Sequence, residues 1–223
     1  MNAPADPQQI DRLQRAERQA EVVRALQPLL PAHTLLWQSE DTIPYECDGL
    51  TAYRERPLVV ALPENEAQVA AVLKACHALG VPVVARGAGT GLSGGAMPHA
   101  MGVVLSLAKF NRIQAIDPRA RTATVQAGVR NLAISEAAAP HGLYYAPDPS
   151  SQIACTIGGN VAENSGGVHC LKYGLTLHNV LRVRGFTAEG EPVEFGGAAL
   201  DAPGLDLLPL VVGLAFELGE GSA

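Results

Sequence analysis

Clustered positive charge is missing from this sequence. Its 223 residues hold 16 Lys and Arg against 22 Asp and Glu, a formal net charge of −6, and no run of basic residues occurs. Neutralising the phosphates of a nucleic acid requires such a run, so the charge pattern excludes nucleic acid as a partner. A small molecule that carries phosphate remains compatible with an acidic protein, because backbone N–H groups can bind phosphate locally.

The sequence also lacks the ligand spacing of a metal site. No two cysteines stand in a C-x-x-C pattern and no two histidines in an H-x-x-x-H pattern, which removes the usual zinc, iron–sulfur and thioredoxin-like sites. We therefore expect no metal, and we interpret the cysteines as buried, reduced thiols. The residues concerned are Cys47, Cys76, Cys155, Cys170, His33, His77, His99, His141, His169 and His178.

No segment has the character of a leader or of a membrane span. Residues 1–6 carry neither the basic nor the apolar part of a secretory signal. The longest apolar run, residues 207–216, is interrupted by Pro209 and Gly213 and is much shorter than the roughly 20 residues that cross a bilayer. We expect no transmembrane segment and a cytoplasmic location.

Apolar residues, in contrast, are abundant at 48%, and charged residues reach only 17%, which excludes disorder as the dominant state. Aromatic residues make up 4%, whereas there are 23 glycines and 16 prolines. The core must therefore be filled by Val, Leu, Ile and Ala between many tight turns.

The first half of the chain predicts a long helix and then a strand–helix–strand unit. Asp6-Pro7 is typical of a helix start, and apolar residues recur to about residue 27; a polar, turn-rich connection follows over 32–53. Strands at 58–61 and 81–85 flank a helix that ends at Gly80, which predicts a parallel pair with a right-handed crossover. The apolar positions of the first helix are Ile10, Leu13, Val22, Val23, Leu26 and Leu30.

The second half predicts further strands and a return to antiparallel pairing. A loop-dominated stretch covers 141–174, and a hairpin turn lies at 187–191. The fold class is α+β or mixed α/β, with a parallel start and a later antiparallel part. The remaining expected elements are strands at 102–107, 113–116, 122–127, 180–185 and 192–195 and a helix over 129–139.

A glycine-rich segment, residues 86–95, follows the second strand of that unit and matches two known patterns. Residues 89–94 satisfy G-x-G-x-x-G, but a dinucleotide fingerprint needs a helix directly behind it and an acidic residue about 20 positions on. Gly94, Gly95 and Pro98 forbid the helix, and no acidic residue lies at 109–113. We therefore reject a Rossmann site.

Residues 91–95 also satisfy G-x-S-x-G, the pattern of a hydrolase nucleophile, which requires a strand leading sharply into the serine and a helix at once after it. Both are missing around Ser93, so a hydrolase is kept only as a remote alternative. What remains is a loop of small residues that leaves a row of N–H groups unpaired, an anion nest suited to a pyrophosphate. A plain surface loop is the competing interpretation.

A second small-residue stretch covers 147–151 and 156–167. Two such stretches in one domain indicate a long ligand with a flat ring, because larger side chains would block close approach of the backbone. Asn160 and Asn164 serve either as turn residues or as hydrogen-bond donors to the ligand, and the sequence leaves both readings open.

Residues 86–95 together with 156–167 resemble the FAD-binding domain of the vanillyl-alcohol oxidase and para-cresol methylhydroxylase family. Within that family the chain is most similar to the FAD-linked subunits of bacterial glycolate oxidases, which are relatives of D-lactate dehydrogenases. The likeness runs from about residue 6 to residue 212 and includes Lys172-Tyr173-Gly174. It implies an α+β FAD-binding fold of two subdomains, a βαβ parallel half and then a mainly antiparallel half, behind an N-terminal helix.

The resemblance also implies which residues bind the cofactor, which is FAD. The first loop holds the pyrophosphate, and the second motif lines the isoalloxazine and the pyrophosphate. The first set is Gly87, Ala88, Gly89, Thr90, Gly91, Ser93, Gly94 and Gly95. The second set is Ser150, Ser151, Thr156, Gly158, Gly159, Asn160, Asn164, Gly166 and Gly167.

The activity that the resemblance implies is oxidation of a small 2-hydroxy acid such as glycolate or D-lactate, with hydride transfer to flavin N5. Electrons then pass to other oxidase subunits, including an iron–sulfur acceptor, which would place the protein at the inner membrane through its partners. Relatives continue differently beyond residue 213, so we expect an N-terminal lead over 1–53 and an incomplete FAD-binding domain over 54–223. The substrate domain is then absent, so we expect the isolated chain to be inactive, and no catalytic residue is assigned. The alternative is an FAD-binding module without catalysis of its own.

Two further expectations follow from the resemblance. Many family members bond the flavin to a histidine four residues after the loop's arginine, and here that position, counted from Arg86, is Thr90. A threonine hydroxyl is a poor nucleophile at neutral pH, so we expect FAD to be bound non-covalently. His169 lies just beyond the second motif; a structural role is the favoured interpretation, and facing the flavin is the alternative.

Overall fold

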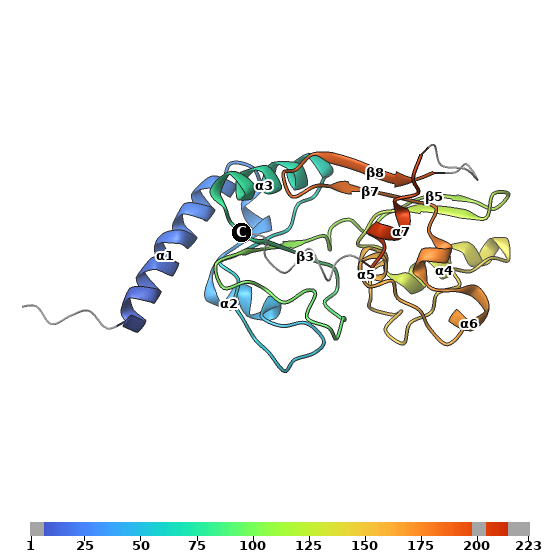
Figure 1. Ribbon diagram of the computed structural model, residues 1–223, viewed down its shortest axis with the longest axis horizontal. Coiled ribbons are helices and arrows are strands. Elements are labelled where there is room, and N and C mark those ends of the chain that lie inside the picture. The colour runs from blue at the N-terminus through green and yellow to red at the C-terminus, as the bar shows by residue number, and fades with distance from the viewer. Residues whose placement is uncertain (1–6, 198–203, 214–223) are drawn as a thin grey trace, which may run out of the picture.

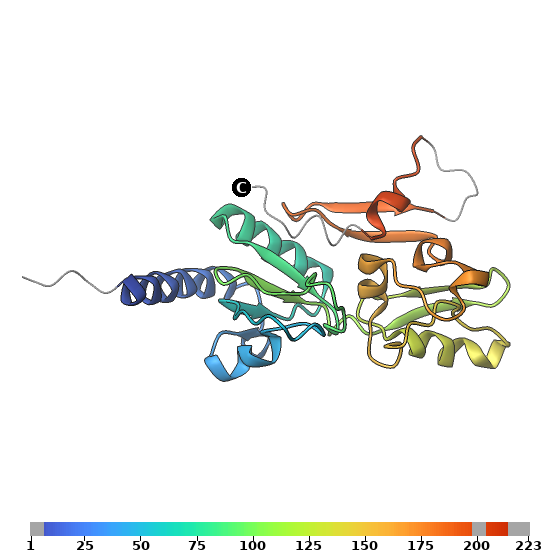
Figure 2. The ribbon, with the colours of Figure 1, turned by 60° about the horizontal axis from the view of Figure 1, so that its bottom comes forward.

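The computed structural model describes residues 7–197 and 204–213. Two lobes lie side by side: a helix-covered sheet is followed by a lobe of short helices and a two-stranded ribbon (Figures 1 and 2). The helices are α1 (Pro7–Leu26), α2 (Ser39–Thr42), α3 (Glu66–Leu79), α4 (Asn131–Ala138), α5 (Ile157–Glu163), α6 (Cys170–Tyr173) and α7 (Leu208–Val211), with 3₁₀ turns at Ala32–Thr34, Ile43–Tyr45, Ala139–His141 and Thr176–Asn179. The strands are β1 (Leu35–Leu36), β2 (Val59–Ala61), β3 (Val83–Arg86), β4 (Val103–Ser106), β5 (Ile113–Asp117), β6 (Thr122–Val125), β7 (Arg182–Phe186) and β8 (Pro192–Gly196).

The sheet of the first lobe has the strand order β1-β2-β4-β3, in which β2, β4 and β3 are parallel and β1 is antiparallel. The predicted βαβ unit is present, but the expectation that its two strands pair directly is wrong. β4 lies between them, and every residue of β2 and β4 is buried. The most apolar strands take the centre of the sheet because both of their faces are covered there.

Helices α1 and α3 pack against each other and build the main core with the sheet. Val22 and Leu26 of α1 and Val72 and Cys76 of α3 are fully buried. Each side chain of this size contributes about 1.5–3 kcal/mol relative to an exposed position. The ends of α3 follow from the sequence: the Asn65 side chain accepts the first free N–H, and Gly80 adopts the left-handed cap.

The first turns of α1 extend beyond the sheet (Figure 1), so the apolar stripe predicted for this helix is buried only in its second half. Leu13, for example, is 57% exposed. Polar contacts fix the helix instead, because Arg15 donates to the carbonyl oxygens of Ala100, Arg56 and Pro57. The predicted cap residue Asp6 and residues 214–216 of the apolar run lie outside the described residues.

The antiparallel second half is confirmed in the pairs β5–β6 and β7–β8. The β7–β8 hairpin runs along one side of both lobes and brings its turn to α3 (Figures 1 and 2). There Lys74 of α3 pairs with Glu191 at 2.9 Å, and Arg184 pairs with Glu66 at 3.0 Å. The hairpin therefore ties the two lobes together.

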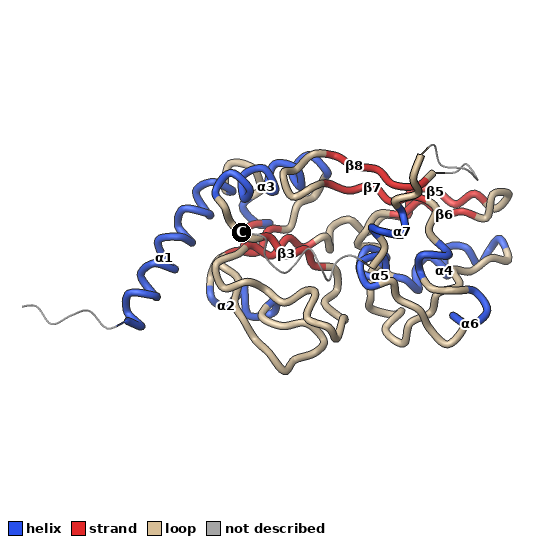
Figure 3. The backbone as a smooth tube through the Cα atoms, viewed as in Figure 1, coloured by secondary structure: helices blue, strands red, loops and turns tan. Residues whose placement is uncertain are grey.

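Two stretches predicted as loops contain regular structure. The connection over 32–53 supplies β1 and α2, and the stretch over 141–174 contains α5 and α6. The helix α5 was not predicted, because the glycines of the second motif are typical of a loop. Thr156 sets the start of α5, since its hydroxyl accepts the N–H of Gly159 at 3.3 Å. In space, mainly long loops lie between β3 and α5 (Figure 3). Among the helices within 7–197 and 204–213, none combines the length and apolarity that a membrane span needs.

The cysteines are all free in the structure: Cys76 and Cys155 are buried, as expected, whereas Cys47 and Cys170 are half-buried. Burial raises the pKa of the Cys76 thiol to about 12. This thiol therefore stays protonated and inert at neutral pH. The division at residues 53 and 54 and the cytoplasmic location stay predictions.

Candidate cofactor site

The first glycine-rich loop leaves β3 at its carboxyl end and continues without a helix, as its glycines and Pro98 predict. Gly89 and Gly94 have φ values of 69° and 85°, which side chains with a Cβ rarely adopt. Within the described part of the chain, no N–H group of residues 87–91 donates a hydrogen bond. Such a row of free N–H groups is what an anion nest requires.

Residues 45–50, which we call the strap segment, contact the loop and hold it in place. Asp48, which is buried, accepts the N–H of Gly94 at 2.9 Å and that of Leu50 at 2.9 Å. A Cβ on Gly49 would lie 2.8 Å from the carbonyl oxygen of Thr90, so only glycine permits this approach. This contact could not be predicted from the sequence, because a single Asp in a turn-rich stretch is typical of any loop.

Arg86 ties the same loop to the sheet. Its guanidinium donates to the carbonyl oxygen of Cys47 at 2.8 Å and to that of Ala96 at 3.4 Å, and it lies 5.6 Å from the ring centre of Tyr45. Burial lowers the pKa of Arg86, whose side chain nevertheless stays charged because its reference value is so high. These partners anchor the loop to the sheet through Arg86.

The second motif forms the helix α5, and its two asparagines differ. Asn164 caps the helix in the left-handed conformation, and its side-chain oxygen accepts the N–H of Leu177 at 3.0 Å. Asn160 lies inside the helix and is 1% exposed, and its Nδ2 has no hydrogen-bond partner among the described residues. A buried amide donor without a partner costs free energy, which a ligand acceptor would recover.

The two motifs meet at both ends of α5. A Cβ on Gly87 would overlap Thr156 Oγ1, and a Cβ on Gly91 would lie 3.0 Å from Glu163 Oε1. The loop therefore contacts the first and the last turn of α5 closely. Gly158 has a different reason to be glycine, because its Cβ would press on Ala127 at 2.9 Å.

The other predicted site residues lie on either side of α5 within the second motif. Ser151 closes a turn by accepting the N–H groups of Ala154 and Cys155 at 2.8 Å. Within the described residues no hydrogen bond links Ser150 or Ser151 to the first loop. A Cβ on Gly166 would lie 2.6 Å from Leu175 Cδ2, and a Cβ on Gly167 would overlap the carbonyl oxygen of Asp148.

Glu163 places a carboxylate beside the first loop. Burial and then the nearby charge of Asp48 raise the pKa of Glu163. A raised pKa in the folded state means that ionised Glu163 lowers the stability of the fold, and that this loss appears as the pH rises through the raised value.

We expect Glu163→Gln to raise Tm at about pH 8 and to lose that advantage as the pH falls toward about 4, where the carboxyl is protonated in both states. Thermal unfolding at several pH values measures this. Glu136→Gln, on the exposed side of α4, is the matched control. An equal gain at all pH values would show that the charge of Glu163 is not the cause.

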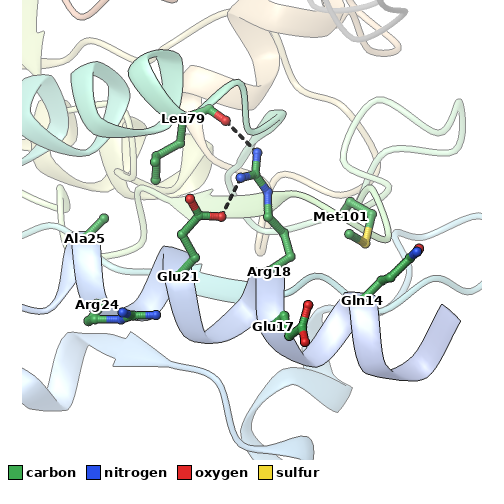
Figure 4. A pocket seen from close by; sticks show the side chains of 8 residues that line it. All are labelled: Gln14, Glu17, Arg18, Glu21, Arg24, Ala25, Leu79 and Met101. Carbon is green, nitrogen blue, oxygen red and sulfur yellow. Dashed lines mark hydrogen bonds and ion pairs between the residues drawn. The ribbon is translucent and has the colours of Figure 1, made fainter. Parts of the chain in front are cut away.

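A groove with a volume of about 790 Å³ lies elsewhere, between α1, the end of α3 and Met101 (Figure 4). Arg18 crosses it: the guanidinium pairs with Glu21 at 2.6 Å and donates to the carbonyl oxygen of Leu79 at 2.5 Å. The groove is shallow and lined by the helix surface, and neither glycine-rich motif contributes to it. It is not the candidate site.

A nest of free N–H groups, a buried unpaired amide and two lobes joined at these motifs define a nucleotide-cofactor-binding domain. The chain belongs to the FAD binding domain family, whose model matches residues 57–196. The strap segment lies outside that match. Membership of this family indicates FAD as the cofactor, and free N–H donors such as those of residues 87–91 are groups that can bind its phosphates.

Curated relatives agree with this membership. The chain is 61% identical over 198 residues to the glycolate oxidase subunit GlcD of Escherichia coli, covering 89% of this chain and 40% of that protein. It is 41% identical to a D-lactate dehydrogenase of Archaeoglobus fulgidus, covering 70% of this chain and 35% of that protein. Among solved structures, alkyldihydroxyacetonephosphate synthase matches with a TM-score of 0.77 at 21% identity over 88% of this chain and 38% of that one, which shows a shared fold.

Proposed function

We propose that this chain is the FAD-binding portion of a flavin-dependent oxidoreductase that oxidises a small 2-hydroxy acid such as glycolate or D-lactate. The observation that carries the proposal is the 61% identity with the glycolate oxidase subunit. The chain spans 40% of the length of that relative, so the activity of a whole protein is an inference here.

The roles of individual residues follow from the site. Backbone N–H groups of residues 87–91 bind the pyrophosphate, and the side-chain amide of Asn160 donates a hydrogen bond to the cofactor. When bound, FAD supplies a hydride acceptor at N5 of its ring. The full proposed set is Gly87, Ala88, Gly89, Thr90, Gly91, Ser93, Gly94, Gly95, Ser150, Ser151, Thr156, Gly158, Gly159, Asn160, Asn164, Gly166 and Gly167.

The hydrolase alternative loses its basis. Ser93 is exposed in a loop, and no helix begins between it and β4, so the strand–turn–helix context of a nucleophile is missing there. An FAD-binding module without catalysis remains the second candidate, because the chain aligns with 40% of the glycolate oxidase subunit and the groups that deprotonate a hydroxy acid are unassigned here. Partner subunits, among them an iron–sulfur electron acceptor, belong to the first proposal.

Titration of the purified chain with FAD tests the binding role, and we expect a yellow complex. Acid precipitation should then release all flavin into the supernatant, because Thr90 offers no nucleophile for a covalent bond. A pellet that stays yellow through washing would contradict non-covalent binding. Failure to bind FAD would overturn the proposal itself.

Turnover of glycolate or D-lactate with an artificial electron acceptor separates the two candidates. Reduction of the acceptor by the FAD-loaded chain supports the oxidoreductase and excludes the module. Bound FAD that no 2-hydroxy acid reduces, in this chain and also after the C-terminal region of the glycolate oxidase subunit is added, favours the module. Glycolamide, which lacks the carboxylate, is the control substrate.

A further inference from the structure

The strap segment, residues 45–50, belongs to neither glycine-rich motif. It also precedes residue 57, where the match to the FAD binding domain family begins. Three contacts nevertheless join it to the first loop: a side chain that accepts a backbone N–H, a close approach of two backbones, and a shared partner in Arg86. The strap segment is therefore part of the candidate site in space, although not in sequence.

Asp48 joins the strap segment to the far end of the loop. Its side chain is buried, and its two carboxylate oxygens have different partners: Oδ1 accepts the N–H of Leu50 within the strap segment, and Oδ2 accepts that of Gly94 in the loop, each at 2.9 Å. A carboxylate that bridges two backbone segments fixes their separation, because both hydrogen bonds weaken when either segment moves.

Gly49 joins the strap segment to the middle of the loop. A Cβ at this position would lie 2.8 Å from the carbonyl oxygen of Thr90 and 2.9 Å from that of Gly91, so these oxygens contact the strap segment directly. In a trans peptide the N–H lies opposite the carbonyl oxygen. The N–H groups of the same two peptides belong to Gly91 and Leu92, and within residues 7–197 and 204–213 neither of them donates a hydrogen bond.

Arg86 connects the strap segment and the loop to the end of β3. Its guanidinium donates to the carbonyl oxygen of Cys47 at 2.8 Å, and a Cβ on Gly89 would overlap the same guanidinium. The strap segment has a further anchor in the ion pair of Glu46 with Arg54 at 2.6 Å. The loop is thus held from two sides with its N–H groups free, which is the arrangement of a preorganised anion site.

We propose that Asp48 and Gly49 are positioning residues for the pyrophosphate of FAD. They hold the first loop so that the N–H groups of Gly91 and Leu92 are free to donate to phosphate oxygens. This inference rests on the proposed function, in which the first loop binds the pyrophosphate. Both residues act through the loop backbone, and the entropy cost of ordering the loop is met on folding rather than on binding.

Asp48→Asn separates positioning from charge by the sign of its effect. The substitution removes a negative charge close to a site for an anion, so electrostatics alone predicts tighter FAD binding. An amide has one acceptor oxygen, which cannot serve the N–H groups of both Leu50 and Gly94. We therefore expect FAD affinity to fall, by about tenfold for one lost hydrogen bond.

Gly49→Ala tests the second contact without backbone strain, because Gly49 has no positive φ. Its methyl group would displace the carbonyl groups of Thr90 and Gly91, and we expect FAD affinity to fall about tenfold or more. Gly185→Ala, in β7, is the matched control. Gly185 also has no positive φ, and nothing lies within 4 Å of its Cβ position, so this variant should bind FAD as the wild type does.

The 223-residue chain and its variants are titrated with FAD by flavin fluorescence, at a temperature where circular dichroism shows each of them to be folded. A purely structural role of the strap segment would leave the affinity of the folded chain unchanged. Amide hydrogen exchange gives a second readout in the wild type. The N–H groups of Gly91 and Leu92 should exchange rapidly without FAD and slowly with it.

Weaker FAD binding by Asp48→Asn and Gly49→Ala, but not by Gly185→Ala, supports the positioning role. Wild-type affinity in Gly49→Ala, or tighter binding in Asp48→Asn, overturns it and leaves the proposed function standing. It is also overturned if FAD binds while Gly91 and Leu92 exchange at the rates of the FAD-free chain. A wild-type chain that binds no FAD refutes the proposed function, and the positioning role with it.

Discussion

Valine at Gly89 or at Gly91 is expected to abolish FAD binding while leaving most of the fold in place. At Gly89 the φ of 69° is strained for any β-branched residue, and a Cβ would overlap the guanidinium of Arg86. At Gly91 the side chain would meet Glu163 at 3.0 Å and cover the free N–H groups. Flavin content after reconstitution and far-UV circular dichroism together measure the effect.

Gly142→Val separates loss of the site from loss of stability. Gly142 has a φ of 68°, nearly the same as Gly89, but nothing lies within 4 Å of its Cβ position. Gly89→Val and Gly142→Val therefore impose a similar backbone strain, on the order of 1–3 kcal/mol. Only Gly89→Val and Gly91→Val should lose FAD. Full flavin content in either variant would refute the assignment of the first loop to the pyrophosphate.

Replacing Asn160 by leucine is expected to move stability and binding in opposite directions. The amide Nδ2 is buried without a partner in the FAD-free chain, and leucine has a similar branched shape without the polar atoms. Removing this unpaired donor should stabilise the FAD-free protein by about 1–3 kcal/mol. It should weaken FAD binding by about tenfold or more, because a buried hydrogen bond to the cofactor is lost.

Asn131→Leu is the control for that experiment. Asn131 is equally buried, at 1% exposure, but its Nδ2 donates to the carbonyl oxygen of Pro147 at 3.0 Å. Leucine there leaves that carbonyl unpaired, so the FAD-free protein should lose stability. Denaturant unfolding and FAD titration give both readouts. If Asn160→Leu lowers stability as Asn131→Leu does, the amide has a partner in the protein and its assignment to FAD fails.

Much of the fold could be predicted because its signals are local. The apolar run that becomes β2, the Asn65 and Gly80 caps of α3, and the alternation that becomes β5 and β6 each lie within a few residues. The glycine-rich loop could likewise be predicted, because its many glycines disfavour a helix and leave the backbone free of large side chains. The helix α5 was missed, since its glycines suggest a loop and its cap, Thr156, is a single residue.

The sequence by itself determined the long helices and most of the strands, the glycine-rich loop that suits a pyrophosphate, and the resemblance to a family. Only the tertiary structure decided which strand stands at the centre of the sheet, that Asp48 holds Gly94, and that His169 pairs with Asp148. It also decided that Asn160 is buried without a partner while Asn164 caps a helix. The reason is physical: local periodicity and turn chemistry act between near neighbours, whereas these contacts join residues 46 and 21 positions apart, and burial decides which polar groups lose water.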